Sequence, residues 1–470
     1  MKVLFVTPEI APWVKTGGLG DVAGALPLAL REAGVDVQVL TPYYPALRTA
    51  FPDATKIAAL DGFGHLSDSD LRRVVAPDGV PLWLLDCPGY YHRPGSPYLG
   101  PEGHDWLDNH LRFGLLSRVA AWFGSEENFL DWKPDVIHGH DWQAAMAPAY
   151  LKLQPGGRAR SLVTIHNLAF QGLFGAATLH ELGLPASAWS IDGVEFFGHL
   201  SFLKAGLRFA DAITTVSPNY ASEIQTEAEG MGMAGLLGQR ADVLTGILNG
   251  IDTVAWNPAQ DRHLAATYDA ANLTAKALNR TALQRELGLV EHGDVPVLGM
   301  VSRLTQQKGV DLIPRISHAL AELPVQLAVL GTGERALEEA LARLSREHPG
   351  QFVVRIGFDE GLAHRIEAGA DIFLMPSRFE PCGLNQMYSL RYGTPPVVRA
   401  TGGLADTVDD EITGFTFTQP TSEALLAAIW RAVSAWHDKA RWRRIQASGM
   451  ERDFSWAEPA RRYAQIYASL

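Results

Sequence analysis

Two short runs place basic side chains where a phosphate group could bind. Residues 15–21, KTGGLGD, follow an apolar run and precede a helical pattern. Glycines at such a strand-to-helix turn let backbone N–H groups approach a pyrophosphate, and Lys15 adds a full positive charge. Residues 301–309, VSRLTQQKG, also join a strand to a helix, and the planar guanidinium of Arg303 with the mobile ammonium of Lys308 suits a diphosphate. Each run alone is also compatible with a structural turn or an exposed basic loop.

Other polar residues stand at the ends of apolar runs. Residues 376–386, PSRFEPCGLNQ, place Glu380 at a strand's carboxyl end, where open α/β sheets bind ligands, although a glutamate there could also cap a helix. Cys382 has no adjacent base to activate it, so we interpret it as a packing thiol. Residues 138–143, HGHDWQ, and 164–167, TIHN, end two strands with side chains suited to sugar hydroxyls. Their histidines lack a zinc-site spacing, and we expect no metal there.

A dinucleotide-binding pattern, Gly-x-Gly-x-x-Ala, occurs twice, beginning at Gly18 and at Gly331. A ribose-binding acid should follow about 20 residues later, at the end of the second strand. The first match is followed by a strand that ends in Leu-Thr-Pro-Tyr, without an acid. The second has Asp359 near the required place but lies deep in the second half of the chain. An oxidoreductase is therefore disfavoured, and a structural turn is the preferred interpretation of Gly331.

The elements that must position these residues form two series of buried strands alternating with helix-length segments. Near-continuous Val/Ile/Leu runs are typical of parallel strands covered by helices on both faces. We expect an α/β protein with two doubly wound domains joined near 247–258, and an antiparallel hairpin over 71–86 around Asp78-Gly79. The first series is predicted at 3–8, 35–42, 135–140, 161–166 and 211–217, and the second at 296–303, 325–331, 352–358, 371–377 and 395–400.

The last segment has the pattern of an amphipathic helix. Ser455 followed by Glu458 predicts a capping box at its start. Its apolar stripe consists of Trp456, Ala460, Tyr463, Tyr467 and Leu470. Such a face must pack on another surface, and we expect the helix to pack against the interdomain region, with a return to the first domain as one way of doing so. The predicted domains are 1–246, which the helix 455–470 joins, and 247–454.

Length and composition exclude several classes of protein. A chain of 470 residues is too long for one core. The net charge of −12 disfavours nucleic acid and anionic membranes as partners. Two cysteines cannot form a disulfide framework, and no apolar run approaches the length of a membrane span, so we expect a cytoplasmic protein with reduced thiols.

Several motifs together resemble one enzyme family. KTGGLGD, HGHDWQ, TIHN, LNGID, SRLTQQKG, EPCGLNQMYSLRYGT and TGGLADTV occur in the order and approximate spacing found in the bacterial glycogen and plant starch synthases. The resemblance spans essentially the whole chain. It implies a GT-B glycosyltransferase fold, with two Rossmann-like domains facing across a deep cleft. It also implies transfer of glucose from ADP-glucose to the non-reducing end of an α-1,4-glucan such as glycogen or a malto-oligosaccharide, with retention of configuration.

The resemblance also implies roles for individual residues. Lys15, Arg303 and Lys308 would contact the donor diphosphate, and Tyr98 would lie near the adenine. The transferred glucose would be surrounded by Asp141, His166, Asn167, Asn249 and Glu380. The remaining donor-binding positions implied are Gly17, Gly18, Cys382, Gly383, Leu384, Thr401 and Gly402. Many other retaining GT-B enzymes have a second glutamate eight positions after the first, where this chain has Tyr388, as the synthases commonly do.

Two alternatives stay open: a related transferase that uses UDP-glucose, and a catalytically silent protein that binds sugar nucleotide or glucan, because fold alone does not establish function. We expect no cofactor other than the donor substrate and no metal. Asp68-Ser69-Asp70 has the Asp-x-Asp pattern with which GT-A transferases hold a divalent ion. Its surroundings are those of a polar turn, and we interpret it as one.

Overall fold

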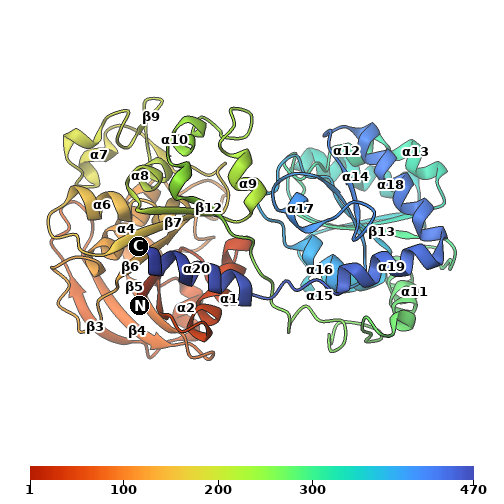
Figure 1. Ribbon diagram of the computed structural model, residues 1–470, viewed down its shortest axis with the longest axis horizontal. Coiled ribbons are helices and arrows are strands. Elements are labelled where there is room, and N and C mark those ends of the chain that lie inside the picture. Colours follow the sequence, from red (N-terminus) through yellow and green to blue (C-terminus); the bar gives the residue numbers. More distant parts are fainter. The chain divides into compact units, whose positions relative to one another are not determined.

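The computed structural model describes residues 1–470, which divide into two compact units (Figure 1). The first contains Met1–Gly250 and Trp456–Leu470, and the second contains Ile251–Ser455. Each unit has its own buried hydrophobic core. No helix in either unit is both long enough and apolar enough to cross a membrane.

The first unit is built on a nine-stranded sheet in which β4 is antiparallel to both of its neighbours, β3 and β5, and all other neighbouring strands are parallel. In spatial order the strands are β12 (Leu244–Gly246), β11 (Ala212–Thr215), β7 (Arg160–Ile165), β6 (Val136–His140), β1 (Lys2–Val6), β2 (Asp36–Pro42), β5 (Pro81–Asp86), β4 (Ser69–Val75) and β3 (Thr55–Leu60). β4 and β5 form the hairpin that the sequence predicts at 71–86.

The helices of this unit connect those strands. They are α1 (Gly18–Glu32), α2 (Pro45–Ala50), α3 (Pro88–Tyr91), α4 (Asn109–Phe123), α5 (Asp141–Ala144), α6 (Ala147–Leu153), α7 (Thr178–Glu181), α8 (Phe202–Phe209), α9 (Pro218–Glu223), α10 (Ala234–Gln239) and α20 (Ala457–Ser469). A small antiparallel sheet, not predicted from the sequence, contains β8 (Leu173–Phe174), β10 (His199–Ser201) and β9 (Glu195–Phe196).

The second unit has a six-stranded, wholly parallel sheet. Its strands in spatial order are β15 (Phe352–Ile356), β14 (Gln326–Gly331), β13 (Val297–Val301), β16 (Ile372–Met375), β17 (Pro396–Arg399) and β18 (Phe415–Phe417). Its helices are α11 (Lys276–Leu287), α12 (Leu312–Arg315), α13 (Ser317–Glu322), α14 (Arg335–Glu347), α15 (Glu360–Gly369), α16 (Asn385–Arg391), α17 (Gly402–Thr407), α18 (Ser422–His437) and α19 (Lys439–Met450).

In each sheet the direction in which successive strands are added reverses once, and the point of reversal matters for ligand binding. In the first unit the chain runs from β1 outward to β2 and β5 on one side, and from β6 to β7, β11 and β12 on the other. In the second unit the reversal lies between β13 and β16. Ligands of open α/β sheets bind outside the carboxyl ends of the strands at such a switch point. The loops that follow β1, β6, β13 and β16 are therefore the ones to inspect.

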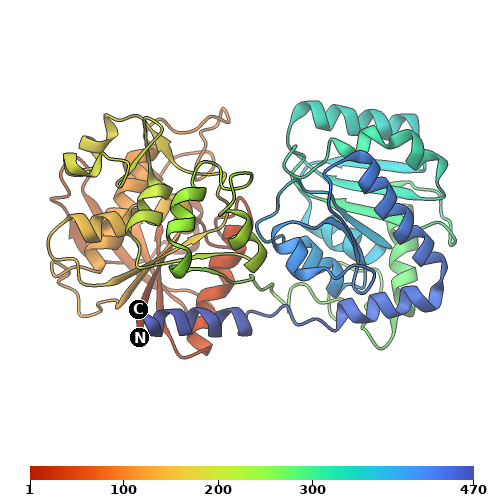
Figure 2. The same cartoon turned by 45° about the horizontal axis from the view of Figure 1, so that its top comes forward.

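The C-terminal helix α20 belongs to the first unit and contacts α1 (Figure 2). Trp456, Ala460, Tyr463 and Tyr467 are buried there, as the apolar stripe predicts. The predicted capping box is wrong. Trp456 occupies the N-cap position without a side-chain cap hydrogen bond, and the Glu458 carboxylate instead pairs with Arg461. Burial of the Trp456 ring fixes the start of the helix one residue later than Ser455 would.

Candidate functional site

The loop after β1 carries Lys15 and the glycine turn at the switch point of the first sheet. Gly17 is the N-cap of α1 with an extended backbone, and Gly18 is the first helical residue. No side chain caps this helix, so its first N–H groups are not taken by a cap. The Lys15 ammonium lies 2.6 Å from the Asp21 carboxylate, with 42% of the lysine side chain exposed. The turn thus offers an accessible cation beside backbone donors.

Asp141, His166 and Asn167 come together at the ends of β6, which neighbours β1, and of β7, the next strand in the sheet. The Asp141 Oδ1 atom accepts hydrogen bonds from the backbone N–H groups of His166 (2.6 Å) and Asn167 (3.3 Å). Asp141 has a left-handed backbone, φ 55°, which few non-glycine residues adopt. Burial raises the pKa of the Asp141 carboxyl to about 7, against the lowering effect of the two N–H donors.

Three histidine side chains lie along the same edge. His138 is fully buried, and its two ring nitrogens are hydrogen bonded to the Tyr467 hydroxyl (2.7 Å) and the Thr164 hydroxyl (2.6 Å). His140 Nδ1 lies 2.9 Å from His166 Nε2, while His140 Nε2 is buried without a partner. Burial lowers the pKa of all three, that of His166 to about 3. At neutral pH these rings are therefore uncharged hydrogen-bonding groups.

Asn249 lies in the loop after β12, at the end of the first unit's main segment. The residue is 6% exposed, and its side-chain Oδ1 has no hydrogen-bond partner. A buried amide oxygen without a hydrogen bond lowers stability by about 1 to 3 kcal/mol. A bound ligand hydroxyl that donated to this oxygen would remove that cost. The sequence motif LNGID indicates the residue, and only the structure reveals the unpaired atom.

In the second unit, Arg303 and Lys308 follow β13 and Glu380 follows β16, the two strands at the switch point. The Glu380 Oε2 atom lies 2.5 Å from the Lys308 ammonium and accepts a hydrogen bond from the Ser377 hydroxyl (3.0 Å). The glutamate side chain is 7% exposed and the lysine side chain 18%. Arg303 is exposed and makes no side-chain hydrogen bond or ion pair. Its charge is thus available to a ligand, whereas that of Lys308 is shared with Glu380.

The loop after β17 packs directly against the Glu380 backbone. Gly403 donates its N–H to the Glu380 carbonyl oxygen (3.1 Å). Gly402, in the left-handed region at φ 45°, approaches so closely that a Cβ atom would stand 1.9 Å from the same oxygen. Thr401 is buried at the N-cap of α17. The TGGLADTV motif thus requires glycine because two strand-end loops touch there.

The 382–384 segment completes this second cluster. Cys382 is buried and forms no disulfide. Gly383 has φ 71°, and a Cβ there would collide with the Gln386 side chain. Leu384 is the N-cap of α16. The structure therefore brings the segment's backbone next to the Glu380 turn, in keeping with the interpretation of Cys382 as a packing thiol.

Residues of the second Gly-x-Gly-x-x-Ala pattern and of the Asp-x-Asp triplet have structural roles. A Cβ on Gly331 would lie 2.0 Å from the Ser302 carbonyl oxygen, so this glycine allows the β13 loop to pack on β14. Asp359 caps α15 by accepting the Leu362 N–H (2.8 Å). Asp70 lies in β4 and pairs with Lys56 at 2.6 Å. No group of three or more His, Cys, Asp or Glu side chains is placed to hold a metal ion.

Sequence reasoning missed two residues at these edges. Glu9, buried three residues beyond β1, accepts hydrogen bonds from Thr16 and from the Tyr98 hydroxyl. The signal was an acid close to the end of an apolar strand. Phe358 follows β15 at the carboxyl edge of the second sheet and is 84% exposed. The apolar run at 352–358 predicts it as the end of a strand, whereas β15 ends at Ile356 and leaves an exposed ring suited to stacking on a planar group.

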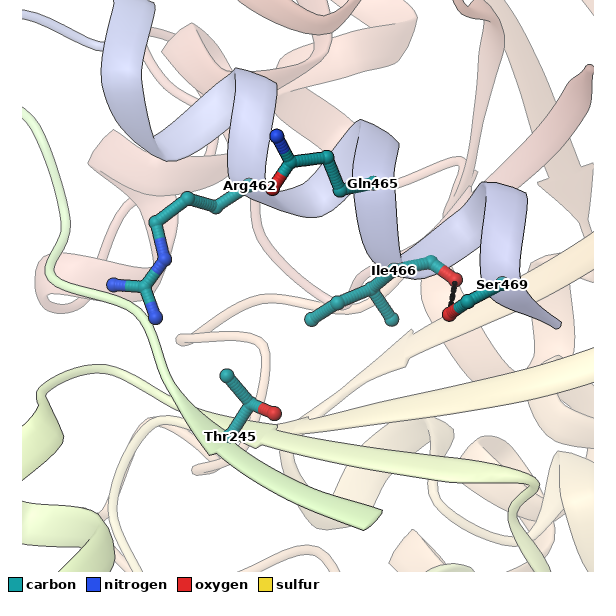
Figure 3. Close-up of a pocket in the computed structure, with 5 residues that line it drawn as sticks. All are labelled: Thr245, Arg462, Gln465, Ile466 and Ser469. Carbon is teal, nitrogen blue, oxygen red and sulfur yellow. Dashed lines mark hydrogen bonds between the residues drawn. The ribbon is translucent and has the colours of Figure 1, made fainter.

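A shallow pocket elsewhere in the first unit does not overlap the predicted site. It lies between α20 and β12 and is lined by Thr245, Arg462, Gln465, Ile466 and Ser469 (Figure 3). Its Arg462 side chain extends toward the strand side of the pocket, away from the helix. None of the five is a predicted site residue, and none belongs to the switch-point loops.

Comparisons with known proteins identify the family of the chain. Residues 2–239 match the starch synthase catalytic domain, and residues 288–448 match the glycosyl transferases group 1 family. The chain is 56% identical to a glycogen synthase of Dechloromonas aromatica, covering 99% of this chain and 98% of the relative. It is 52% identical to a glycogen synthase of Nitrosospira multiformis, covering 100% and 97%.

Solved structures extend the likeness to the fold. The catalytic domain of starch synthase IV from Arabidopsis thaliana, bound to ADP and acarbose, superimposes with a TM-score of 0.87 at 32% identity over 99% of this chain and 98% of that one. A sucrose-phosphate synthase from Thermosynechococcus elongatus, with a TM-score of 0.61 and 18% identity over 100% and 98%, shares the fold alone. The predicted GT-B fold and family are confirmed: this chain belongs to the glycogen and starch synthase family and is a glucosyltransferase.

Proposed function

We propose that the enzyme transfers glucose from ADP-glucose to the non-reducing end of an α-1,4-glucan and retains the anomeric configuration. The observation that carries this proposal is the occurrence of the motif residues in loops at the carboxyl ends of strands, Lys15, Arg303, Lys308 and Glu380 among them at the switch points, within a chain of this family. The donor is favoured by the relative from Arabidopsis thaliana, which binds ADP. The same protein binds acarbose, which supports a glucan as acceptor.

The donor diphosphate would meet three cations. Lys15 sits beside the exposed turn of α1, Arg303 has a free guanidinium, and Lys308 is held by Glu380. Preorganised charges of this kind stabilise the negative charge that develops on a leaving phosphate, typically by several kcal/mol. For the adenine, Tyr98 is the candidate from family resemblance, and the exposed ring of Phe358 is a second candidate.

Sugar hydroxyls would bind to the neutral groups of the first unit. The neutral ring of His166 and the side-chain amides of Asn167 and Asn249 can donate and accept hydrogen bonds without carrying a charge. Asp141 orients the backbone at His166 and Asn167 through its Oδ1 atom. Glu380 and the 382–384 backbone would contact the glucose from the second unit.

The proposed mechanism is a front-face displacement. Retaining glycosidases use two carboxylates about 5 Å apart, one as the nucleophile. We do not assign Glu380 as a nucleophile, because the sequence offers no obvious second carboxylate to complete such a pair; its Oε2 atom is instead bonded to Lys308 and Ser377. The departing ADP phosphate would instead accept the proton of the incoming acceptor hydroxyl. The C1–O bond to ADP breaks while the bond from the acceptor oxygen forms on the same face.

One assay tests the function. The enzyme is incubated with glycogen and either ADP-glucose or UDP-glucose, and nucleotide release and chain extension are measured. We expect both to occur with ADP-glucose. Preference for UDP-glucose would show that UDP-glucose, and not ADP-glucose, is the donor. Binding of the nucleotide without chain extension would indicate a protein that binds the sugar nucleotide and has no transferase activity.

A further inference from the structure

A buried carboxylate links the two loops of the first unit that carry Lys15 and Tyr98. Glu9 is 3% exposed. Its Oε2 atom accepts the Thr16 backbone N–H, and its Oε1 atom accepts the Thr16 hydroxyl, both at 2.6 Å. The Tyr98 hydroxyl, 89 residues away in the chain, donates to the same Oε1. One side chain therefore holds both loops.

Other contacts leave this part of the turn without support. The loop after β1 is braced on one side by the Ile10 and Val14 backbone pair and on the other by the Ala11 N–H to Gly20 carbonyl bond. Between them, a Cβ on Gly17 would find no atom within 4 Å, so nothing packs against the turn there. At the tip, Thr16 donates both its backbone N–H and its hydroxyl to Glu9, while the Lys15 ammonium pairs with Asp21. The backbone of Thr16, between Lys15 and Gly17, is thus held by Glu9.

The Tyr98 loop is anchored in the same way. Asn109 donates its side-chain N–H to the Tyr98 carbonyl oxygen at 3.0 Å, which fixes the backbone. The hydroxyl is fixed by Glu9 alone. Burial, and then the neighbouring Glu9 carboxylate, raises the pKa of Tyr98 well above its ordinary value, so the phenol remains a donor.

We propose that Glu9 is a positioning residue for glucosyl transfer: it sets the Lys15 turn and the Tyr98 ring relative to each other by accepting from both. This inference rests on the proposed role of those two residues in donor binding. Glu9 itself need not touch the substrate, because its two oxygens are already occupied by three donors. A misplacement of about 1 Å at a phosphate contact can cost on the order of 100-fold in rate.

The test compares Glu9→Ala and Glu9→Gln with a matched control. A glutamine can turn its oxygen to the Thr16 N–H and its NH2 toward the two hydroxyls, so it preserves the link without the charge. Asp211 is the control, because it also accepts an N–H and a hydroxyl from one residue, Ser161, at 2.8 and 2.9 Å. It lies at the amino ends of β7 and β11, the opposite edge of the sheet.

Kinetics and ADP binding are measured at a temperature at which every variant is folded by calorimetry. We expect Glu9→Ala to lower kcat/KM for ADP-glucose about 10- to 100-fold and to weaken ADP binding in titration calorimetry. Glu9→Gln should stay within about threefold of wild type, and Asp211→Ala should lose stability without a change in KM. Failure of the wild type to extend glycogen would refute the proposed function instead, since ADP binding is read separately.

Two results would overturn the proposal. Glu9→Ala could behave like Asp211→Ala, with reduced stability and unchanged kinetics, which would make Glu9 structural only. Glu9→Gln could be as impaired as Glu9→Ala, which would show that the charge itself is required. If Glu9→Ala does not fold, Thr16→Val and Tyr98→Phe replace it. Because both act through one carboxylate, their combined loss should be smaller than additive, and additivity would contradict the link.

Discussion

Replacing Asp141 with Asn should stabilise the first unit at neutral and alkaline pH while impairing turnover. The carboxyl is 8% exposed and accepts two backbone N–H groups through one oxygen. An asparagine can keep that oxygen in place and cannot ionise. The substitution therefore removes the charge and leaves the hydrogen bonds to His166 and Asn167.

The magnitude follows from the pKa of this carboxyl. Burial raises it from 3.8 to about 7, and each pKa unit corresponds to about 1.4 kcal/mol, so ionising the buried acid costs about 4 kcal/mol. Between pH 4 and pH 7 the folded state binds more protons at this group than the unfolded state does. The contribution of the protonated Asp141 carboxyl to the free energy of unfolding is therefore fully present below pH 4 and is lost as the pH rises to about 7.

The assay is calorimetric unfolding of wild type and Asp141→Asn from pH 4 to pH 8. The two should differ little at pH 4, and the variant should be more stable by up to about 4 kcal/mol at pH 8, on the order of 10 °C in Tm for a unit of this size. Asp211→Asn is the control of opposite sign: burial raises the pKa of Asp211, but the bonds from Lys152 and Ser161 outweigh it and hold that pKa low. A difference between wild type and Asp141→Asn that is independent of pH would refute the reasoning.

Three further substitutions and conditions test the catalytic assignments. Glu380→Ala should lower kcat by orders of magnitude in a protein that still folds, with some loss of Tm because Lys308 loses its partner; turnover within a few-fold of wild type in the glycogen assay would show that the site is wrongly placed. Arg303→Ala or Lys308→Ala should cost about 2 to 4 kcal/mol in kcat/KM, and a normal kcat with only weaker donor binding would contradict leaving-group stabilisation. Activity should survive excess EDTA and the double change Asp68→Ala with Asp70→Ala. The expectation would be overturned if activity were lost on chelation and restored by Mn²⁺, and if the double mutant were inactive.

The sequence predicted the strands well because their burial on two faces leaves a strong apolar signal. The runs predicted at 135–140 and 296–303, for example, correspond to β6 (Val136–His140) and β13 (Val297–Val301). It missed β3, β12 and β18, which lie at or near sheet edges and are short or mixed in polarity. The failed capping box has another cause. Local capping preference at Ser455 is weaker than the burial of Trp456 in the core.

The sequence predicts which loops form the candidate site, but it does not predict the contacts that the side chains of those loops make. Strand ends place Lys15, His166 and Glu380 at carboxyl edges, and this follows from the order of the motifs. Several contacts at these edges join segments that are distant in the chain. Glu9 meets Tyr98 across 89 residues, and Lys308 meets Glu380 across 72. No periodicity encodes such pairings, because they depend on how the loops close after the sheet has formed.

Some residues at these edges break local rules that the cores obey. Asp141 is a buried acid in a left-handed conformation, and the side-chain atoms His140 Nε2 and Asn249 Oδ1 are buried without partners. Each of these features costs about 1 to 3 kcal/mol. The buried cores offset that cost in the free enzyme, and a bound sugar could satisfy the open hydrogen bonds. Features that are expensive for folding and placed at the carboxyl ends of strands are where selection for chemistry outweighs selection for stability.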